Sequence, residues 1–209
     1  MTAAGQVPPT DKPFSEAPRG RVSSLALALG VTFVLVAGAW YVGEREGFGA
    51  IGAGGQNLRL LPKIGDPAPD FVAPTVDGRL VQLSALRGQP VWLNFWGSWC
   101  PPCRSEFPEM QAAYSTTLQP AGVVLLAVSL DEPPEAAAGF AARNRGTFTI
   151  LTDPKRKLTG AAYPIVNFPT HILIDREGIV RDVVLAPIDE AEIAARAQRI
   201  IDPDVTGGA

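Results

Sequence analysis

VWLNFWGSWCPPCRSEFPEM, residues 91–110, contains both cysteines of the chain, in a Cys-x-x-Cys spacing. Its first six residues, 91–96, carry no charge, and this predicts a strand that is buried on both faces. A Gly-Ser pair then breaks the strand, and the two prolines between the cysteines favour the first turn of a helix, where no N–H partner is needed. The stretch therefore predicts a strand that leads directly into a helix, with Cys100 at the helix N-terminus.

This placement gives the two cysteines different chemical roles. The helix dipole and free amide donors stabilise a thiolate at Cys100, and the thiolate is the form that attacks. Cys103 follows one turn later on the same helix face, close enough to form a disulfide and to release a partner bound as a mixed disulfide. We therefore predict thiol–disulfide exchange, in which Cys100 attacks and Cys103 resolves.

A zinc site is the main alternative for a Cys-x-x-Cys pair. A structural zinc ion needs four ligands, and this chain has no further cysteine and a single histidine, His171. The sequence therefore favours a redox-active disulfide between Cys100 and Cys103, without metal or other cofactor.

The motif WGSWCPPCRSEFP, together with the later Phe168-Pro169-Thr170, resembles the thioredoxin superfamily. Within it, the chain is most similar to the membrane-tethered TlpA/ResA type, which is linked to cytochrome c maturation, over about residues 64–201. The resemblance implies that Pro169 is cis and lies against the cysteine pair, which leaves the preceding backbone free to bind a substrate chain. A plain turn proline is the alternative.

The order of the expected elements agrees with an α/β thioredoxin-like fold, a mixed sheet flanked by helices. An Asp-Gly turn at residues 77–78 adds an N-terminal hairpin extension, and one transmembrane helix precedes the domain. We expect strands at residues 91–96, 123–128, 170–174 and 179–185, and helices at residues 101–117, 131–144, 155–162 and 189–201.

Glu106 is the candidate proton acceptor. Thioredoxin carries an aspartate six residues before its first cysteine, and this chain has Asn94 there, which cannot take up a proton at neutral pH. Glu106 comes one helical turn after Cys103 and matches the active-site glutamate of the ResA-like branch. The alternative is an exposed helix glutamate, which is how we interpret Glu109.

The N-terminal part predicts a membrane anchor. Residues 1–21 are rich in Pro, Ala, Thr and Gly and are expected to be disordered. Residues 22–43 carry no charge and, at ~1.5 Å per residue, are long enough to cross a hydrocarbon core of ~30 Å as a signal-anchor. A cleaved signal peptide is the alternative. We expect a flexible Gly-rich linker at residues 44–61 and the thioredoxin-like domain at residues 62–205.

Charge gives the orientation and excludes one class of partner. The net charge is −3 and the sequence pI is about 5.2, without a basic stripe, which argues against nucleic-acid binding. Basic residues flank the apolar segment equally, but Arg19 and Arg21 lie close to it and favour an N-terminus inside the cell. The resemblance points the same way, to a single-pass protein of the bacterial cytoplasmic membrane with its catalytic domain on the periplasmic side.

The predicted function is a membrane-tethered extracytoplasmic thiol–disulfide oxidoreductase that reduces partner proteins. The resemblance implies apocytochrome c as substrate and a transmembrane thiol protein as electron donor. One alternative is a copper-binding chaperone that uses His171 with the two thiolates. The other is peroxiredoxin-like peroxide reduction, which requires Pro-x-x-x-Thr-x-x-Cys, where this chain has Leu93 and Gly97.

Overall fold

The structure is a computed structural model that describes residues 26–37 and 60–202. The chain divides into two units, residues 1–55 and 56–209, which we describe separately. In the first unit, residues 26–37 form a helix with exposed apolar side chains. No helix within the described residues has the length and apolar character needed to cross a membrane. The predicted anchor extends beyond the described residues at both ends, and the predicted tail and nearly all of the predicted linker lie outside them.

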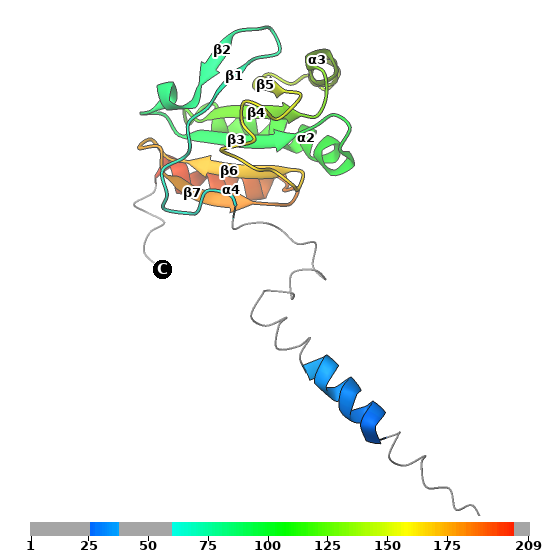
Figure 1. Ribbon diagram of the computed structural model, residues 1–209. Coiled ribbons are helices and arrows are strands. Elements are labelled where there is room, and N and C mark those ends of the chain that lie inside the picture. Colours follow the sequence, from blue (N-terminus) through cyan, green and yellow to red (C-terminus); the bar gives the residue numbers. More distant parts are fainter. Residues whose placement is uncertain (1–25, 38–59, 203–209) are drawn as a thin grey trace, which may run out of the picture. The chain divides into compact units, whose positions relative to one another are not determined.

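The second unit contains a five-stranded sheet in the order β5-β4-β3-β6-β7 (Figure 1). Strands β3, β4 and β5 are parallel, whereas β6 runs antiparallel to β3 and β7 antiparallel to β6. The predicted thioredoxin-like α/β fold with a mixed sheet is therefore confirmed. The strands are β3 (Val91–Trp96), β4 (Val124–Leu130), β5 (Thr149–Asp153), β6 (Thr170–Ile174) and β7 (Val180–Val184).

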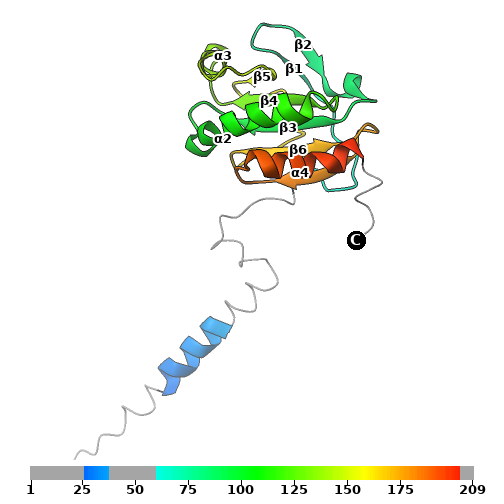
Figure 2. The same ribbon diagram turned by 180° about the vertical axis from the view of Figure 1, so that it is seen from behind.

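Strand β3 occupies the centre of the sheet, and all six of its residues are buried, as their uncharged sequence predicted. Three helices accompany the sheet, and Figure 2 shows α2 and α4 in front of it. A short π-helical turn, Tyr114–Leu118, continues α2. The helices are α2 (Pro101–Ala113), α3 (Pro134–Arg143) and α4 (Glu190–Ile201).

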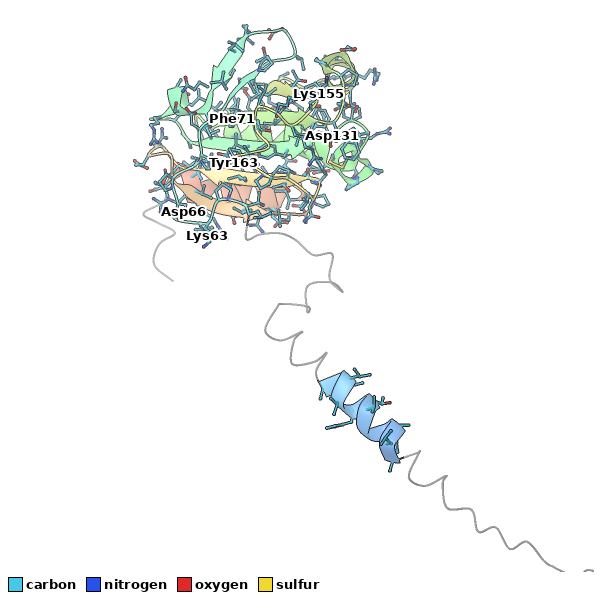
Figure 3. All side chains as sticks on the ribbon, viewed as in Figure 1. Lys63, Asp66, Phe71, Asp131, Lys155 and Tyr163 are labelled. Carbon is cyan, nitrogen blue, oxygen red and sulfur yellow. A yellow bond between two sulfur atoms is a disulfide. The ribbon has the colours of Figure 1, made fainter. Side chains whose placement is uncertain are left out.

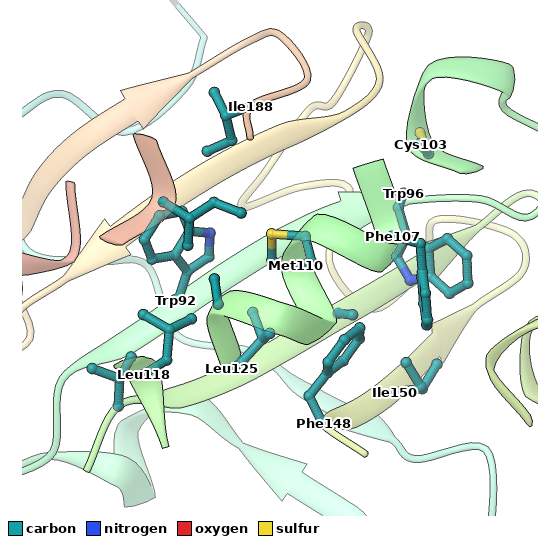
Figure 4. Packing of buried hydrophobic residues seen from close by; sticks show 14 of the residues in the cluster. Trp92, Trp96, Cys103, Phe107, Met110, Leu118, Leu125, Phe148, Ile150 and Ile188 are labelled. Carbon is teal, nitrogen blue, oxygen red and sulfur yellow. The ribbon is translucent and has the colours of Figure 1, made fainter. Parts of the chain in front are cut away.

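Aromatic side chains fill the core between the sheet and the helices. Buried residues of all three helices belong to one cluster with Trp92 and Trp96 of β3, part of which Figure 4 shows. The ring of Phe107 on α2 lies 5.3 Å from the ring of Trp96 and 5.2 Å from that of Phe140 on α3. Both cysteines belong to the same cluster, so the redox pair is built on a packed core.

A second cluster covers the other face of the sheet, and the predicted hairpin contributes to it. The hairpin consists of β1 (Val72–Pro74) and β2 (Leu80–Gln82), and a 3₁₀ helix, Leu83–Leu86, follows it. Tyr163 packs edge-on against Phe71, with ring centroids 5.8 Å apart, and the two residues lie close together in Figure 3. Burial raises the pKa of the Tyr163 phenol.

The structure differs from the expected elements at two places. Strand β5, at the edge of the sheet, was not predicted, and the helix expected at residues 155–162 is wrong because this stretch forms turns. The carboxylate of Asp153 accepts hydrogen bonds from the backbone N–H groups of Lys157, Leu158 and Thr159. These side-chain bonds replace the backbone bonds of a regular helix.

Candidate active site

Cys100 and Cys103 form a disulfide, with their Cα atoms 5.3 Å apart. Each residue is only 2% exposed. Cys100 is the N-cap residue of α2, as predicted, and its Sγ accepts a hydrogen bond from the backbone N–H of Cys103 at 3.3 Å. The helix N-terminus therefore directs one amide donor at the sulfur expected to attack.

The two residues between the cysteines limit this support. Pro101 and Pro102 occupy the first helical positions, where proline has no N–H to offer. A helix N-terminus normally presents several free N–H groups. Here the N–H of Cys103 is the donor that reaches Cys100, so the thiolate receives less hydrogen bonding than an N-terminus without prolines would give.

Pro169 lies at the start of β6, and the Phe168–Pro169 peptide bond is cis. The first residue of β6, Thr170, pairs with Phe95 near the end of β3, from which the cysteine loop departs. The indole ring of Trp99, beside Cys100, packs against Phe168 with centroids 5.0 Å apart. The proline loop and the cysteine loop are therefore neighbours, as the resemblance implied.

Arg156 contacts the loop that precedes Pro169. Its guanidinium lies 5.2 Å from the centroid of the Phe168 ring and donates to the backbone carbonyl of Ile165. The same guanidinium forms an ion pair with Asp131. Arg156 thus connects the loop before Pro169 to the segment that follows β4.

Glu106 is buried, with 3% of its surface exposed, so the alternative of an exposed helix glutamate is wrong for this residue. Glu109 is exposed, as expected. The Oε1 atom of Glu106 accepts a hydrogen bond from the backbone N–H of Ile188 at 2.9 Å and lies 2.9 Å from Nε2 of His171. Glu106 follows Cys103 by one turn of α2.

His171 is fully buried on β6, directly opposite Asn94 of β3 in the sheet register. Its Nδ1 accepts a hydrogen bond from the indole N–H of Trp92 at 3.2 Å. Its Nε2 is close to Glu106, although the N–H direction is poorly aligned with the carboxylate oxygen. The sequence offered His171 as a copper ligand or as an ordinary packing residue of a strand. It did not predict this contact, which joins residues far apart in the chain.

Glu132 is a second buried carboxylate near the cysteine loop. It accepts hydrogen bonds from the backbone N–H of Ser98 at 2.8 Å, from the Ser98 hydroxyl, and from the hydroxyl of Ser129 at 2.6 Å. The carboxylate therefore fixes the loop two residues before Cys100. Its position directly after a buried strand was the only signal in the sequence.

The structure gives no support to a bound metal. Among residues 26–37 and 60–202, no group of three or more His, Cys, Asp or Glu side chains could hold a metal ion. The ring nitrogens of His171 face Trp92 and Glu106. The copper-chaperone alternative therefore lacks a ligand set in the part of the chain that the structure describes.

Comparisons with known proteins agree with this geometry. The chain matches the model of the AhpC/TSA family over residues 64–183. It is 37% identical over 137 residues to the thiol-disulfide oxidoreductase ResA of Geobacillus thermodenitrificans, covering 66% of this chain and 78% of that protein.

Two solved structures are similar as well. One, assigned as the thiol:disulfide interchange protein DsbE of Chlorobium tepidum, has 38% identity and a TM-score of 0.56, covering 67% of this chain and 96% of that one. The other, a secreted thiol-disulfide isomerase from Corynebacterium glutamicum, has 26% identity and a TM-score of 0.58, covering 65% and 85%. The chain therefore belongs to the AhpC/TSA family of thioredoxin-fold proteins, and it is a thiol–disulfide oxidoreductase that uses Cys100 and Cys103 as its redox pair.

Proposed function

We propose that the protein is a membrane-tethered, extracytoplasmic reductant of protein disulfides, with apocytochrome c as its substrate. The observation that carries the direction of the reaction is the surroundings of Cys100. Two prolines withhold amide donors from its sulfur, and buried carboxylates lie nearby on α2 and after β4. Strong oxidants owe their potential to a very stable thiolate, which these features disfavour.

The reaction begins with the dithiol form. The thiolate of Cys100 attacks one sulfur of the partner's disulfide, and the other partner sulfur leaves as a thiolate and takes up a proton. Cys103 then gives its proton to the carboxylate of Glu106 and attacks Sγ of Cys100. The second partner sulfur is released, takes up a proton, and the Cys100–Cys103 disulfide forms. Two electrons have passed from the dithiol to the partner, and a transmembrane thiol protein restores them.

Pro169 and its loop form the docking edge in this proposal. The start of β6 borders the cysteine loop, and Trp99 and Phe168 give that border an apolar surface. An extended partner segment that lies along this edge presents its disulfide to Cys100. A partner segment pairs with this edge over a short length only, so the contact suits a partner that must dissociate after one exchange.

The proposed anchor is residues 22–43, with the catalytic domain on the periplasmic side of the bacterial cytoplasmic membrane. The support is the uncharged apolar sequence, together with the exposed apolar side chains of the helix at residues 26–37. The secreted isomerase from Corynebacterium glutamicum is a similar domain that works outside the cytoplasm. A tether keeps such a domain close to a membrane-bound electron donor.

A reduction assay tests the proposed direction and substrate. The reduced protein is mixed with a disulfide-bonded Cys-x-x-Cys-His peptide, which represents the haem-binding segment of an apocytochrome c, and free thiols are counted over time. We expect rapid peptide reduction and a redox potential well below about −120 mV, the value of a strong periplasmic oxidant. A potential near that value, or no preference for this peptide over an unrelated disulfide peptide, contradicts the proposal.

Cell fractionation tests the anchor separately. The full-length protein is expected in the membrane fraction after carbonate extraction, and a variant lacking residues 1–43 is expected in the soluble fraction. A soluble full-length protein whose mature chain begins near Trp40 would identify the segment as a cleaved signal peptide instead.

A further inference from the structure

We propose that His171 is a positioning residue for Glu106: it holds the carboxylate in place and ionised, so that Glu106 can accept the proton of Cys103. The inference rests on the proposed role of Glu106 and assigns a function to the only histidine of the chain. The His171 ring touches neither sulfur in this mechanism and acts through the carboxylate.

Trp92 determines which ring nitrogen of His171 carries the hydrogen. The indole N–H can only donate, and it donates to Nδ1 at 3.2 Å, so Nδ1 must offer its lone pair. A neutral imidazole then carries its hydrogen on Nε2. Because Nε2 lies 2.9 Å from Oε1 of Glu106, this hydrogen is directed at the side of the ring where the carboxylate is.

The contact between His171 and Glu106 matters for stability because both side chains are buried. His171 is 0% exposed and Glu106 is 3% exposed, so the contact between the two side chains is shielded from water. Apart from Glu106, no acceptor lies within reach of Nε2 among the described residues. An unpaired buried N–H is costly, and so is a buried carboxylate with too few donors. The two groups lie within contact distance, although the N–H is not aligned with Oε1 in this state.

The two carboxylate oxygens of Glu106 have different surroundings. Oε1 faces the backbone N–H of Ile188 and the ring of His171. Within residues 60–202, Oε2 accepts no hydrogen bond from a backbone or side-chain donor, and Glu106 lines a surface pocket. The anchored oxygen fixes the group, and the free oxygen can receive the proton and pass it to solvent.

The charges around this pocket make a donor necessary. Glu109 on α2, Asp189 before α4 and Glu192 on α4 line the same pocket, so negative charge surrounds Glu106 on the solvent side. Arg196 pairs with Glu192. On β3, the side chains next to His171 are the uncharged Trp92 and Asn94. His171 on β6 is therefore the side chain that offers a hydrogen to the carboxylate.

The test separates the two exchange steps with 5,5′-dithiobis(2-nitrobenzoate). The reduced protein releases one coloured thiolate when Cys100 attacks and a second when Cys103 resolves, and only the second release depends on a base for Cys103. The rate of the second release is measured against pH in the full chain. We expect the rate of the second release to fall at low pH, where Glu106 is protonated. This fall, the acid limb of the profile, should be absent in Glu106→Gln.

Three variants then examine His171. His171→Leu removes the donor, so the acid limb should move upward by about one pH unit, because a lost hydrogen bond to a charged group makes the carboxylate take up its proton more readily. Trp92→Phe removes the group that selects the Nε2–H form and should move the limb in the same direction by less. His171→Gln keeps an N–H donor and should restore the limb close to that of the unmodified protein.

The outcomes distinguish the inference from the proposed function. If Glu106→Gln leaves the second release and its pH profile unchanged, Glu106 is not the base, and the role of His171 fails with it. If Glu106→Gln removes the limb but His171→Leu and Trp92→Phe do not move it, Glu106 keeps its role and the inference on His171 is wrong. If His171→Leu does not fold, Trp92→Phe and His171→Gln test the inference in its place. A variant that slows the second release equally at every pH, without moving the acid limb, contradicts the inference.

Discussion

The indole ring of Trp99 meets the phenyl ring of Phe168 edge-on, at 69° and with 5.0 Å between the ring centroids. One ring belongs to the cysteine loop and the other to the loop that ends in Pro169. Trp99 is 47% exposed, and its N–H donates to the carbonyl of Leu130 at 3.0 Å, so the exposed ring is held in a fixed orientation. The two loops therefore present one apolar surface beside the disulfide.

Trp99→Ala should weaken the reaction with protein disulfides more than the reaction with small ones. An edge-on aromatic pair contributes about 0.5–1.5 kcal/mol beyond its buried area, so kcat/KM for a protein substrate should fall roughly two- to tenfold. The rate with 5,5′-dithiobis(2-nitrobenzoate) should change less, because that reagent is too small to span both loops. Leu80→Ala, which shortens an exposed apolar side chain on the hairpin, is the matched control. Equal losses with both substrates would contradict a docking role.

Cys103→Ala should accumulate mixed disulfides with partner proteins. Without the resolving thiol, the bond between Cys100 and the partner persists until another thiol attacks it. Non-reducing electrophoresis of cell extracts, followed by mass spectrometry, identifies the trapped partners. Cys100→Ala is the control and should trap none. Trapping by Cys100→Ala but not by Cys103→Ala would reverse the assigned roles of the two cysteines, and equal trapping by both variants would contradict a division of roles.

Glu132→Gln should destabilise the fold near the cysteine loop. The carboxylate accepts three hydrogen bonds in a buried setting, and the amide keeps one acceptor oxygen, removes the charge and puts an N–H₂ donor in place of the other oxygen. We expect a loss of about 1–3 kcal/mol in the free energy of unfolding, measured with urea. Glu135→Gln, on an exposed position of α3, should cost almost nothing. Equal effects of the two changes would contradict a structural role for Glu132.

Asp70 should make the hairpin sensitive to acid. Hydrogen bonds from the Gln82 side chain and from Ser84 hold the pKa of the Asp70 carboxyl below its ordinary value of 3.8. A lowered pKa in the folded state adds stability that is fully present above the unfolded value and is lost as the pH falls through the folded value. Asp70→Asn should therefore destabilise the fold at neutral pH, only slightly because solvent screens this exposed carboxyl, and the difference from the unmodified protein should shrink below pH 3.8. A difference that stays constant down to pH 2 would contradict this explanation.

The sequence was sufficient for the redox centre because local chemistry determines it. An uncharged run becomes the central strand, and prolines at the first positions start the helix, so the position of Cys100 at the N-cap follows from neighbouring residues alone. The edge strand β5 was missed because its five residues, TILTD, show neither strict alternation nor an uninterrupted apolar run, and they are ordered by pairing with β4. The false helix at residues 155–162 has helical composition, but the Asp153 side chain competes for its amides.

The surroundings of the cysteine pair were predicted only in part. Glu106 was found from its spacing to Cys103, which is a property of one helix. Its contact with His171 depends on how β6 pairs with β3, and no local pattern contains that register. Glu132 was missed for the same reason, since its partners, Ser98 and Ser129, come from the cysteine loop and the end of β4.

Three prolines border the disulfide: Pro101 and Pro102 between the cysteines, and Pro169 at the neighbouring strand end. Proline contributes a carbonyl oxygen to the backbone and no N–H. At these three positions, the backbone can therefore donate no hydrogen bond to a partner chain. The carbonyl oxygens of a partner chain therefore have to find their hydrogen-bond donors at other positions along this edge.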